Sequence, residues 1–213
     1  MSASAFIYRF EPGTRPEATP LLLLHGTGGN ESDMLALGRT VAPDAALLSP
    51  RGKVLEHGMA RFFRRLAEGV FDEDDVRRRA HELADFVDNA RTLYGIPAPV
   101  ALGYSNGANI AAAMLLLHPE VLSGAVLLRA MVPLTTAPPV DLAAKPVLII
   151  SGAQDPIVTA ENAARLADLL RASRATVDHR VLPAGHGLSD ADVAMAQQWL
   201  RKFTARIDKA AVA

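Results

Sequence analysis

The sequence predicts an α/β protein in which helices cover both faces of a central, mostly parallel sheet of about seven strands. Short apolar runs alternate with longer amphipathic segments, which is the pattern of parallel strands joined by helices. Hydrophobic residues make up 50% of the 213 residues, enough to bury a substantial core. Because no repeat or Gly/Ser linker divides the chain, we expect a single domain over residues 1–213.

The predicted strands are short apolar runs, most of them bounded by turn-forming residues: Phe6–Phe10, Leu21–Leu24, Ala45–Leu48, Val100–Gly103, Ala125–Leu128, Val147–Ser151 and Val177–Leu182. The predicted helices are longer segments with helical spacing of apolar residues: Glu31–Ala42, Glu73–Tyr94, Asn106–His118, Thr159–Ala172 and Asp190–Thr204. Thr159 can act as an N-cap, and Gly95 can adopt the left-handed conformation after a helix. These signals support the predicted boundaries.

Two irregular stretches are expected to border a binding site. Arg51–Phe71 and Pro133–Pro146 each follow a predicted strand and lack a regular apolar pattern. Ligands of open α/β sheets bind at the carboxyl ends of the strands, where both stretches begin. We therefore expect a substrate pocket between them.

Composition excludes several function classes. The 22 basic and 23 acidic residues leave a net charge of -1, too small to attract nucleic acid or an anionic membrane. The chain has no cysteine, which excludes disulfides, thiolate metal sites and a cysteine nucleophile. Met1–Gly13 lacks the pattern of a secretory leader, and no apolar run approaches the roughly 20 residues of a membrane span. We expect a cytoplasmic protein.

A G-x-S-x-G motif follows a predicted strand and opens a predicted helix. Gly103, Ser105 and Gly107 form it. In such a turn the serine is strained with its hydroxyl exposed, and the glycines let strand and helix approach closely. The alternative is a glycine-rich turn whose serine only caps the helix. The strand before the motif and the small residues after it favour Ser105 as a nucleophile.

A carboxylate and an imidazole follow two later strands. Asp155 lies just beyond a strand end, where a triad acid would orient a histidine, although an aspartate before proline also commonly starts a turn. His186 lies between glycines after the next strand, and the reference pKa of histidine near 6.5 suits a general base. A histidine of a surface loop is the alternative reading of His186.

The chain order serine, aspartate, histidine at successive strand ends is the order of the α/β-hydrolase fold. We therefore predict a catalytic triad of Ser105, Asp155 and His186. Asp178 and Asp190 are weaker candidates for the acid because neither follows a strand at the corresponding place.

A glycine-rich loop, His25–Glu31, joins a predicted strand to a helix. A phosphate-binding loop is the rival interpretation, but the segment has no lysine and matches neither nucleotide-binding glycine motif. The backbone N–H groups of Thr27 and Asn106 are the predicted oxyanion donors, with Gly28 as the alternative to Thr27. We expect His25 to hold the loop by hydrogen bonding and not to bind a metal, since no second ligand lies at metal-binding spacing.

Together these motifs resemble the bacterial phospholipase/carboxylesterase family, small relatives of the acyl-protein thioesterases. The matching segments are His25–Gly29, Ser49–Gly52, Gly103–Gly107, Gly152–Val158 and Gly185–Gly187. The resemblance covers essentially the whole chain. It implies the α/β-hydrolase fold without a large inserted cap, the same triad, and Thr27 with Asn106 as oxyanion donors.

One departure from the acyl-protein thioesterases concerns specificity. Those enzymes usually have glutamine after the serine and leucine after the first His-Gly, where this chain has Asn106 and Thr27. The departure argues against depalmitoylation. It leaves the mechanism unaffected because the oxyanion donors are backbone groups.

The sequence gives candidates for the substrate pocket. Phe62, Phe63, Met131 and Val132 could line it, although each is equally suited to core packing. The Arg61–Arg65 segment could recognise an acidic substrate or pack a loop onto the core through its arginine stems.

We predict a serine hydrolase that cleaves small esters or thioesters with short or medium acyl groups and needs no cofactor or metal. Two alternatives stay open, an amide or peptide hydrolase with the same triad and a non-catalytic ligand-binding relative. The oligomeric state is also open, a homodimer included.

Overall fold

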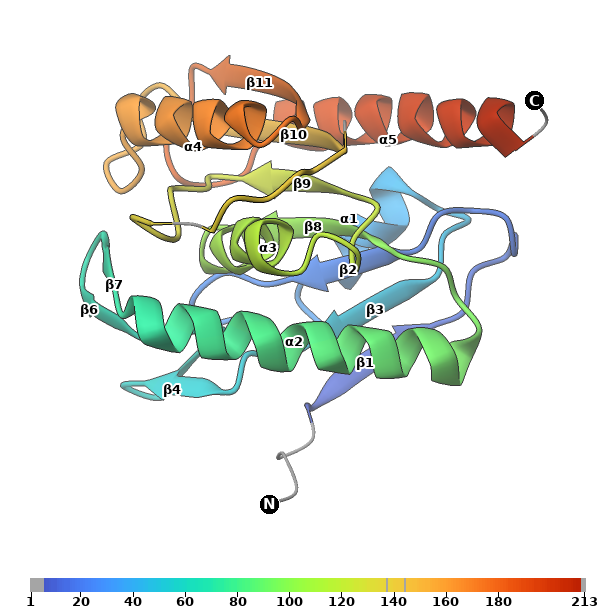
Figure 1. Ribbon diagram of the computed structural model, residues 1–213, viewed down its shortest axis with the longest axis horizontal. Coiled ribbons are helices and arrows are strands. Elements are labelled where there is room, and N and C mark those ends of the chain that lie inside the picture. Colours follow the sequence, from blue (N-terminus) through green and yellow to red (C-terminus); the bar gives the residue numbers. More distant parts are fainter. Residues whose placement is uncertain (1–5, 137, 144, 212–213) are drawn as a thin grey trace.

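The computed structural model describes residues 6–136, 138–143 and 145–211 (Figure 1). The two ends of the predicted domain, residues 1–5 and 212–213, lie outside the described residues. So do Ala137 and Ala144 of the predicted proline-rich stretch.

The centre of the fold is a seven-stranded sheet with the strand order β1-β3-β2-β8-β9-β10-β11. All neighbouring strands are parallel except β1 and β3, which pair antiparallel. The strands are β1 (Tyr8–Glu11), β2 (Leu21–Leu24), β3 (Leu47–Pro50), β8 (Val100–Tyr104), β9 (Gly124–Leu128), β10 (Pro146–Gly152) and β11 (Thr176–Leu182). The predicted mostly parallel sheet is confirmed.

Helices cover both faces of this sheet, as predicted (Figure 1). They are α1 (Leu35–Val41), α2 (Glu73–Tyr94), α3 (Asn106–Leu117), α4 (Ala160–Ala172) and α5 (Asp190–Ala211). Alternate residues of a strand point to opposite faces, so Leu22 and Leu24 pack in the core under α2, α3 and α4. Leu21 and Leu23 pack in the second core under α1 and α5. All four leucines are 0% exposed, and burial of each contributes about 1.5–3 kcal/mol.

Most of the predicted helices and strands differ from the observed ones by one or two residues at an end, and two helices differ by more. Helix α1 begins at Leu35 instead of Glu31 because the preceding residues form a side-chain turn, in which Asn30 Oδ1 accepts from Ser32 N at 2.8 Å. Helix α5 continues past the predicted end at Thr204 to Ala211.

The predicted irregular stretch Arg51–Phe71 contains two small hairpins. Strand β4 (Val54–Glu56) pairs with β5 (Met59–Arg61), and β6 (Arg65–Ala67) pairs with β7 (Val70–Phe71). Strands of two or three residues are too short to show an alternating pattern, which explains why the sequence did not reveal them. We call these two hairpins, β4 to β7, the hairpin wall.

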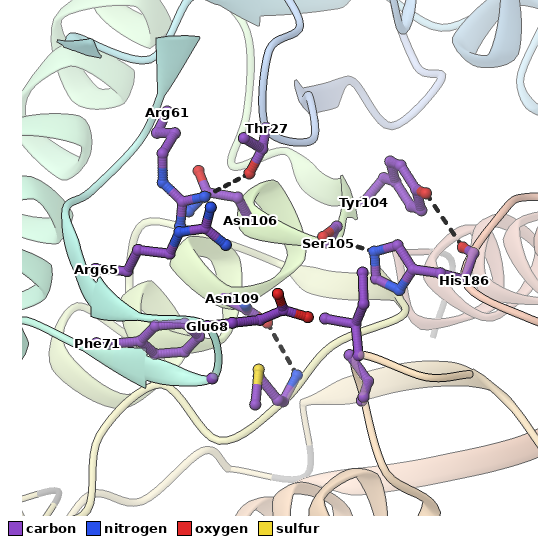
Figure 2. Close-up of a pocket in the computed structure, with 14 residues that line it drawn as sticks. Thr27, Arg61, Arg65, Glu68, Phe71, Tyr104, Ser105, Asn106, Asn109 and His186 are labelled. Carbon is purple, nitrogen blue, oxygen red and sulfur yellow. Dashed lines mark hydrogen bonds between the residues drawn. The ribbon is translucent and has the colours of Figure 1, made fainter. Parts of the chain in front are cut away.

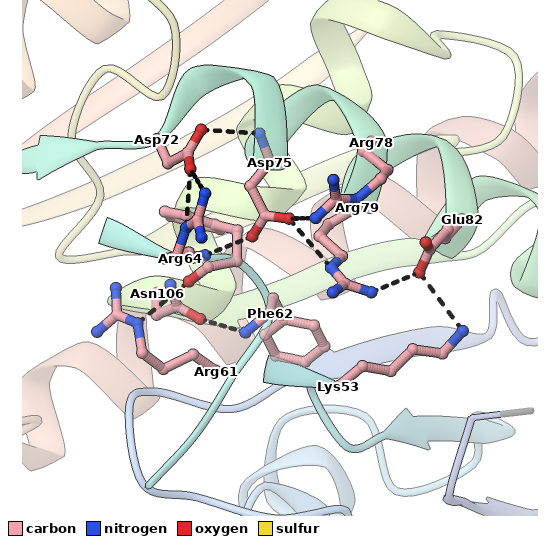
Figure 3. A network of polar contacts seen from close by, with 11 residues as sticks. Lys53, Arg61, Phe62, Arg64, Asp72, Asp75, Arg78, Arg79, Glu82 and Asn106 are labelled. Carbon is pink, nitrogen blue, oxygen red and sulfur yellow. Dashed lines mark hydrogen bonds and ion pairs between the residues drawn. The ribbon is translucent and has the colours of Figure 1, made fainter. Parts of the chain in front are cut away.

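The hairpin wall is fastened to the N-terminal end of α2 (Figure 3). The Asp75 carboxylate, 3% exposed, accepts the backbone N–H of Arg64 at 2.7 Å and also pairs with Arg78 and Arg79. Arg64 Nε donates to Asp72 at 2.8 Å. Polar contacts thus fix this wall beside the carboxyl ends of the central strands.

Within the described part of the chain, none of the helices combines the length and apolar character that a membrane span requires.

Candidate active site

Ser105 lies on a sharp turn between β8 and α3. Its backbone has φ 52° and ψ -115°, a conformation that costs a non-glycine residue about 1–3 kcal/mol. The flanking glycines are required by close approach. A Cβ on Gly103 would lie 2.6 Å from the carbonyl oxygen of Gly107, and a Cβ on Gly107 would lie 2.0 Å from that of Leu24. The turn therefore holds the Ser105 hydroxyl above the strand ends.

The structure brings the three predicted triad residues into one chain of hydrogen bonds. His186 Nε2 lies 2.9 Å from Ser105 Oγ, and His186 Nδ1 lies 2.8 Å from Asp155 Oδ2 (Figure 2 shows the serine and the histidine). An ionised carboxylate can only accept, so Nδ1 carries the proton and Nε2 accepts from the serine hydroxyl. This is the tautomer that a general base for Ser105 requires.

The environment of Asp155 keeps its carboxyl group ionised. Burial alone would raise the pKa of Asp155, but hydrogen bonds outweigh it and hold the pKa below its usual value. The donors are the backbone N–H of Val158 at 3.0 Å, the imidazole of His186 and the backbone N–H of Ile157 at 2.8 Å. The negative charge therefore faces the imidazole throughout the neutral pH range.

Arg129 holds the loop that carries His186, a role that the sequence analysis missed. Its side chain is 0% exposed, with Nε donating to Gly185 O at 2.9 Å and Nη2 donating to Gly187 O at 3.1 Å. The same guanidinium makes a two-pronged pair with Asp192, at 2.6 and 2.9 Å. Burial would raise the pKa of Asp192, but the bonds from Arg129 and Ser189 keep it lowered. The backbone on both sides of His186 is thus fixed from inside the protein.

The predicted oxyanion donors are the backbone N–H groups of Thr27 and Asn106. The Thr27 and Asn106 N–H groups have no hydrogen-bond partner among the described residues, and both residues line the same pocket as Ser105. The Gly28 N–H, the predicted alternative, already donates to Ala60 O at 2.9 Å. The geometry therefore favours Thr27 over Gly28.

His25 joins the Thr27 loop to the end of β3. Its Nδ1 lies 2.7 Å from Gly26 O, and the backbone N–H of Gly52 donates to Nε2 at 3.0 Å. Because Nε2 accepts, the ring is neutral. Burial is the main reason why the pKa of His25 is lowered. These contacts link the Thr27 loop to the end of β3, and the supporting role of His25 stays a prediction.

Side-chain amides of α3 hold the pocket walls. Asn106 Oδ1 accepts the N–H of Phe62 at 2.7 Å, and Asn109 Oδ1 accepts the N–H of Met131 at 2.9 Å (Figures 2 and 3). Asn106 thus contributes a backbone donor to the oxyanion site and a side chain that fixes the hairpin wall.

The pocket at Ser105 has a volume of about 210 Å³ (Figure 2). Apolar lining comes from Phe71, Met131, Ile157 and Val158, and charged lining comes from Arg61, Arg65 and Glu68. Within the described residues, no group of three or more histidine, cysteine or acidic side chains is arranged to hold a metal ion.

Of the predicted pocket residues, the structure places only Met131 in the lining. Phe62 and Phe63 are 3% and 0% exposed and belong to the core, because both side chains turn inward between the hairpins. Val132 lies next to the site, with its N–H bonded to Asn162 Oδ1 at 2.8 Å. The sequence missed Phe71, which lies at the end of a hairpin too short to be recognised.

The weaker candidates lie away from this pocket. Asp178 pairs with Arg180 at 2.7 Å, and Asp190 is the first residue of α5. A second serine–histidine contact joins Ser151 Oγ and His179 Nε2 at 2.8 Å. Ser151 is 1% exposed, and no carboxylate of the described residues bonds to His179, so this pair lacks an acid and an accessible hydroxyl.

Comparison with known proteins gives one consistent result. The family model described as Phospholipase/Carboxylesterase matches residues 7–204. The chain is 46% identical over 195 residues to the putative hydrolase MhqD of Bacillus subtilis (strain 168), covering 91% of this chain and 96% of that protein. The solved Bacillus cereus carboxylesterase is 44% identical with a TM-score of 0.91, covering 94% and 96% of the two chains. A carboxylesterase from Mesorhizobium loti is 35% identical with a TM-score of 0.88, covering 94% and 97%.

Proposed function

Because the chain belongs to the phospholipase/carboxylesterase family, we propose that it is a serine hydrolase that cleaves small carboxylic esters or thioesters through an acyl-enzyme on Ser105. The observation that carries the proposal is the bonded series Ser105, His186 and Asp155 beside two N–H groups that have no partner among the described residues. A serine, its base and an oriented acid next to oxyanion donors are the parts that acyl transfer requires.

The reaction follows from this geometry in two displacements. His186 Nε2 takes the hydroxyl proton as Ser105 Oγ attacks the ester carbonyl carbon, and the Thr27 and Asn106 N–H groups bind the oxyanion. The imidazolium then gives its proton to the leaving alcohol or thiol, and the carbon–oxygen or carbon–sulfur bond breaks. Water attacks the acyl-enzyme with His186 again as base, which releases the acid and regenerates the serine.

The size of the pocket supports a small acyl group. A volume of about 210 Å³ with one apolar side holds a short chain, whereas a long acyl tail needs more covered apolar surface. The expected substrates are therefore short-chain or medium-chain esters and thioesters, which a chain-length series of nitrophenyl esters would rank.

Replacement of Ser105 by alanine tests the proposal. We expect Ser105→Ala to lower kcat/KM for nitrophenyl butyrate by at least about 10³-fold and to abolish labelling by a fluorophosphonate probe. Ser151→Ala is the matched control, since it removes another serine that contacts a histidine, and it should keep full activity. Equal activity in Ser105→Ala and wild type, with both folded by circular dichroism, would contradict the mechanism.

A further inference from the structure

Arg61 and Arg65 face the pocket from the hairpin wall (Figure 2). Arg61 is 3% exposed, yet its guanidinium lines the pocket. Its Nε donates to Phe63 O at 3.2 Å, and its Nη1 donates to Thr27 Oγ1 at 2.6 Å. These two bonds use Nε and Nη1, so the N–H groups of Nη2 are not used in them.

The remaining donors of the two arginines lack partners. Among the described residues, Arg61 Nη2 and both terminal nitrogens of Arg65 donate to no acceptor in the protein, and none of the three is a buried atom. Such donors take an acceptor from solvent or from a ligand, because an unpaired donor costs free energy. N–H donors that face a pocket can bind an acceptor group of a ligand.

The charges around these donors favour an anion. Glu56 is the one carboxylate that contacts either arginine among the described residues, at 3.6 Å from Arg61 Nη1 and 3.0 Å from Arg65 Nε. Glu56 neutralises one of the two positive charges by direct contact, and the second is opposed only by Glu68, which lines the same pocket but contacts neither arginine among the described residues. Planar guanidinium groups bind carboxylates through paired N–H···O bonds.

The position of the group connects it to the reaction. Arg61 bonds to the side chain of Thr27, whose backbone N–H is the proposed oxyanion donor. An ester carbonyl bound at Thr27 and Asn106 therefore lies close to the Arg61 guanidinium, and Arg65 lines the same pocket. A pocket of about 210 Å³ has room for a second polar group on a short chain.

From these contacts we propose that Arg61 and Arg65 form a carboxylate subsite, so that the preferred substrates are short esters or thioesters that carry a free carboxylate, such as half-esters of small dicarboxylic acids. The proposal rests on the proposed hydrolase function and specifies its substrate class. Glu68, which lines the same pocket and has no ion pair among the described residues, opposes the arginines and tunes the subsite.

A purely structural role does not explain both arginines. Arg61 Nε and Nη1 tie the hairpin wall to the Thr27 loop, which is a structural task. Arg65 makes no such tie. Among the described residues its side chain bonds only to Glu56, through Nε; it is about one-third exposed, and still lines the pocket. Arg65 is therefore the residue whose replacement separates substrate binding from folding.

Matched substrates provide the test. We compare kcat/KM for monoethyl succinate with ethyl butyrate, which has a methyl group in place of the carboxylate, by titrating the released acid. A second pair, acetylglycolate and ethyl acetate, moves the carboxylate to the alcohol part of the ester. The two pairs distinguish which side of the scissile bond reaches the arginines.

The central variant is Arg65→Gln, and its control is Arg64→Gln. Arg64 is the adjacent arginine, but it pairs with Asp72 and does not line the pocket. A charge-assisted hydrogen bond is worth enough for about tenfold in binding. We expect Arg65→Gln to lower kcat/KM at least about tenfold for one carboxylate ester and less than about twofold for its neutral partner. Arg64→Gln should change neither, and Glu68→Gln should raise the value for the carboxylate ester.

A binding measurement separates this inference from the proposed function. Monoethyl succinate is titrated into Ser105→Ala protein by calorimetry, with and without the added change Arg65→Gln. Binding that Arg65→Gln weakens at least about tenfold supports the subsite even if no ester is turned over. Turnover of neutral esters without any preference for either carboxylate ester, or a preference that Arg65→Gln leaves intact, overturns the subsite while the hydrolase stands.

Discussion

The two sides of the pocket are built differently. On the histidine side, the loop around His186 depends on Arg129 and Asp192, which are both 0% exposed and bonded to each other and to the loop backbone. On the opposite side, the hairpin wall consists of strands of two or three residues, with Leu55 and Leu66 at least 70% exposed. The loop around His186 is thus fixed from the protein interior, whereas the outer part of the hairpin wall lies on the protein surface.

This difference separates chemistry from selection. The triad needs fixed distances, and a fully bonded interior supplies them because buried networks resist rearrangement. The wall that contacts the rest of the substrate has buried anchors at Phe62, Phe63 and Asp75, but its outer part depends on local turns and on ion pairs such as Arg64–Asp72, which contribute little individually. Changes in the wall should therefore alter which ester is cleaved before they alter how it is cleaved.

The largest expected effect is on the histidine side. Asp155→Asn should lower kcat by about 10⁴-fold while the fold persists, because an amide can stabilise the wrong tautomer of His186. Asp178→Asn, which removes one of the two weaker candidates for the acid together with its pair with Arg180, should keep wild-type kcat. Stopped-flow or steady-state ester hydrolysis checks both. A loss within tenfold in Asp155→Asn would remove Asp155 from the triad.

Breaking the buried pair should come next. Arg129→Met leaves the Asp192 carboxylate buried without its partner, and we expect about 3–5 kcal/mol less stability in urea unfolding. kcat should also fall, because Gly185 O and Gly187 O lose their donor.

The double variant Arg129→Met with Asp192→Leu separates the two effects. Removing both charges should restore most of the stability, since no unpaired ion remains in the interior. It should not restore kcat if Arg129 positions His186. Recovery of both together would reduce Arg129 to a stabilising residue.

A smaller effect is expected from acidification at His25. Its pKa is lowered in the folded protein, so below the unfolded value of about 6.5 the unfolded chain binds a proton that the folded protein does not. Stability therefore falls as the pH drops below about 6.5, by at most about 1.4 kcal/mol per pH unit for this one proton.

Melting temperatures between pH 8 and pH 5 measure this effect. His25→Gln should show a shallower decline than wild type. Part of the decline will remain, because burial also lowers the pKa of His118 and His179. An unchanged slope in His25→Gln would show that His25 is not neutral in the fold. The carboxyl groups of Asp155 and Asp192, whose pKa values are lowered, lose their contribution only at pH values below about 4.

The smallest effect should be on the hairpin wall. Arg64→Gln removes an exposed ion pair with Asp72, and it should cost no more than about 1 kcal/mol in urea unfolding. Comparison with Arg129→Met gives the contrast between the two sides directly. A loss as large as that of Arg129→Met would mean that the wall is as rigid as the interior.

The sequence predicted what depends on local order. Ser105, Asp155 and His186 each follow an apolar strand within a few residues and stand near glycine or proline, so the topology of a parallel sheet placed them at one edge. The strands and long helices were predictable for the same reason, because their periodicity is carried by neighbouring residues.

What the sequence could not predict depends on distant partners. Arg129 at the end of an apolar strand reads as a surface residue until Asp192, 63 positions later, is found against it. Phe62 and Phe63 were expected in the pocket, but hairpins of this length give no signal of which way a side chain turns. The orientation of Arg61 is likewise set by its bond to Thr27, 34 positions away.

Asp192 lies in the first turn of α5 and pairs with Arg129, which bonds to the backbone on both sides of His186. The C-terminal helix is therefore linked to the proposed catalytic imidazole. A fusion, a tag or a proteolytic cut that detaches this helix from the sheet would separate Asp192 from Arg129, and the backbone beside His186 would be held less firmly. Such an enzyme would lose activity while most of its sheet stayed folded. Loss of turnover would therefore report damage to the C-terminal helix before the protein unfolds.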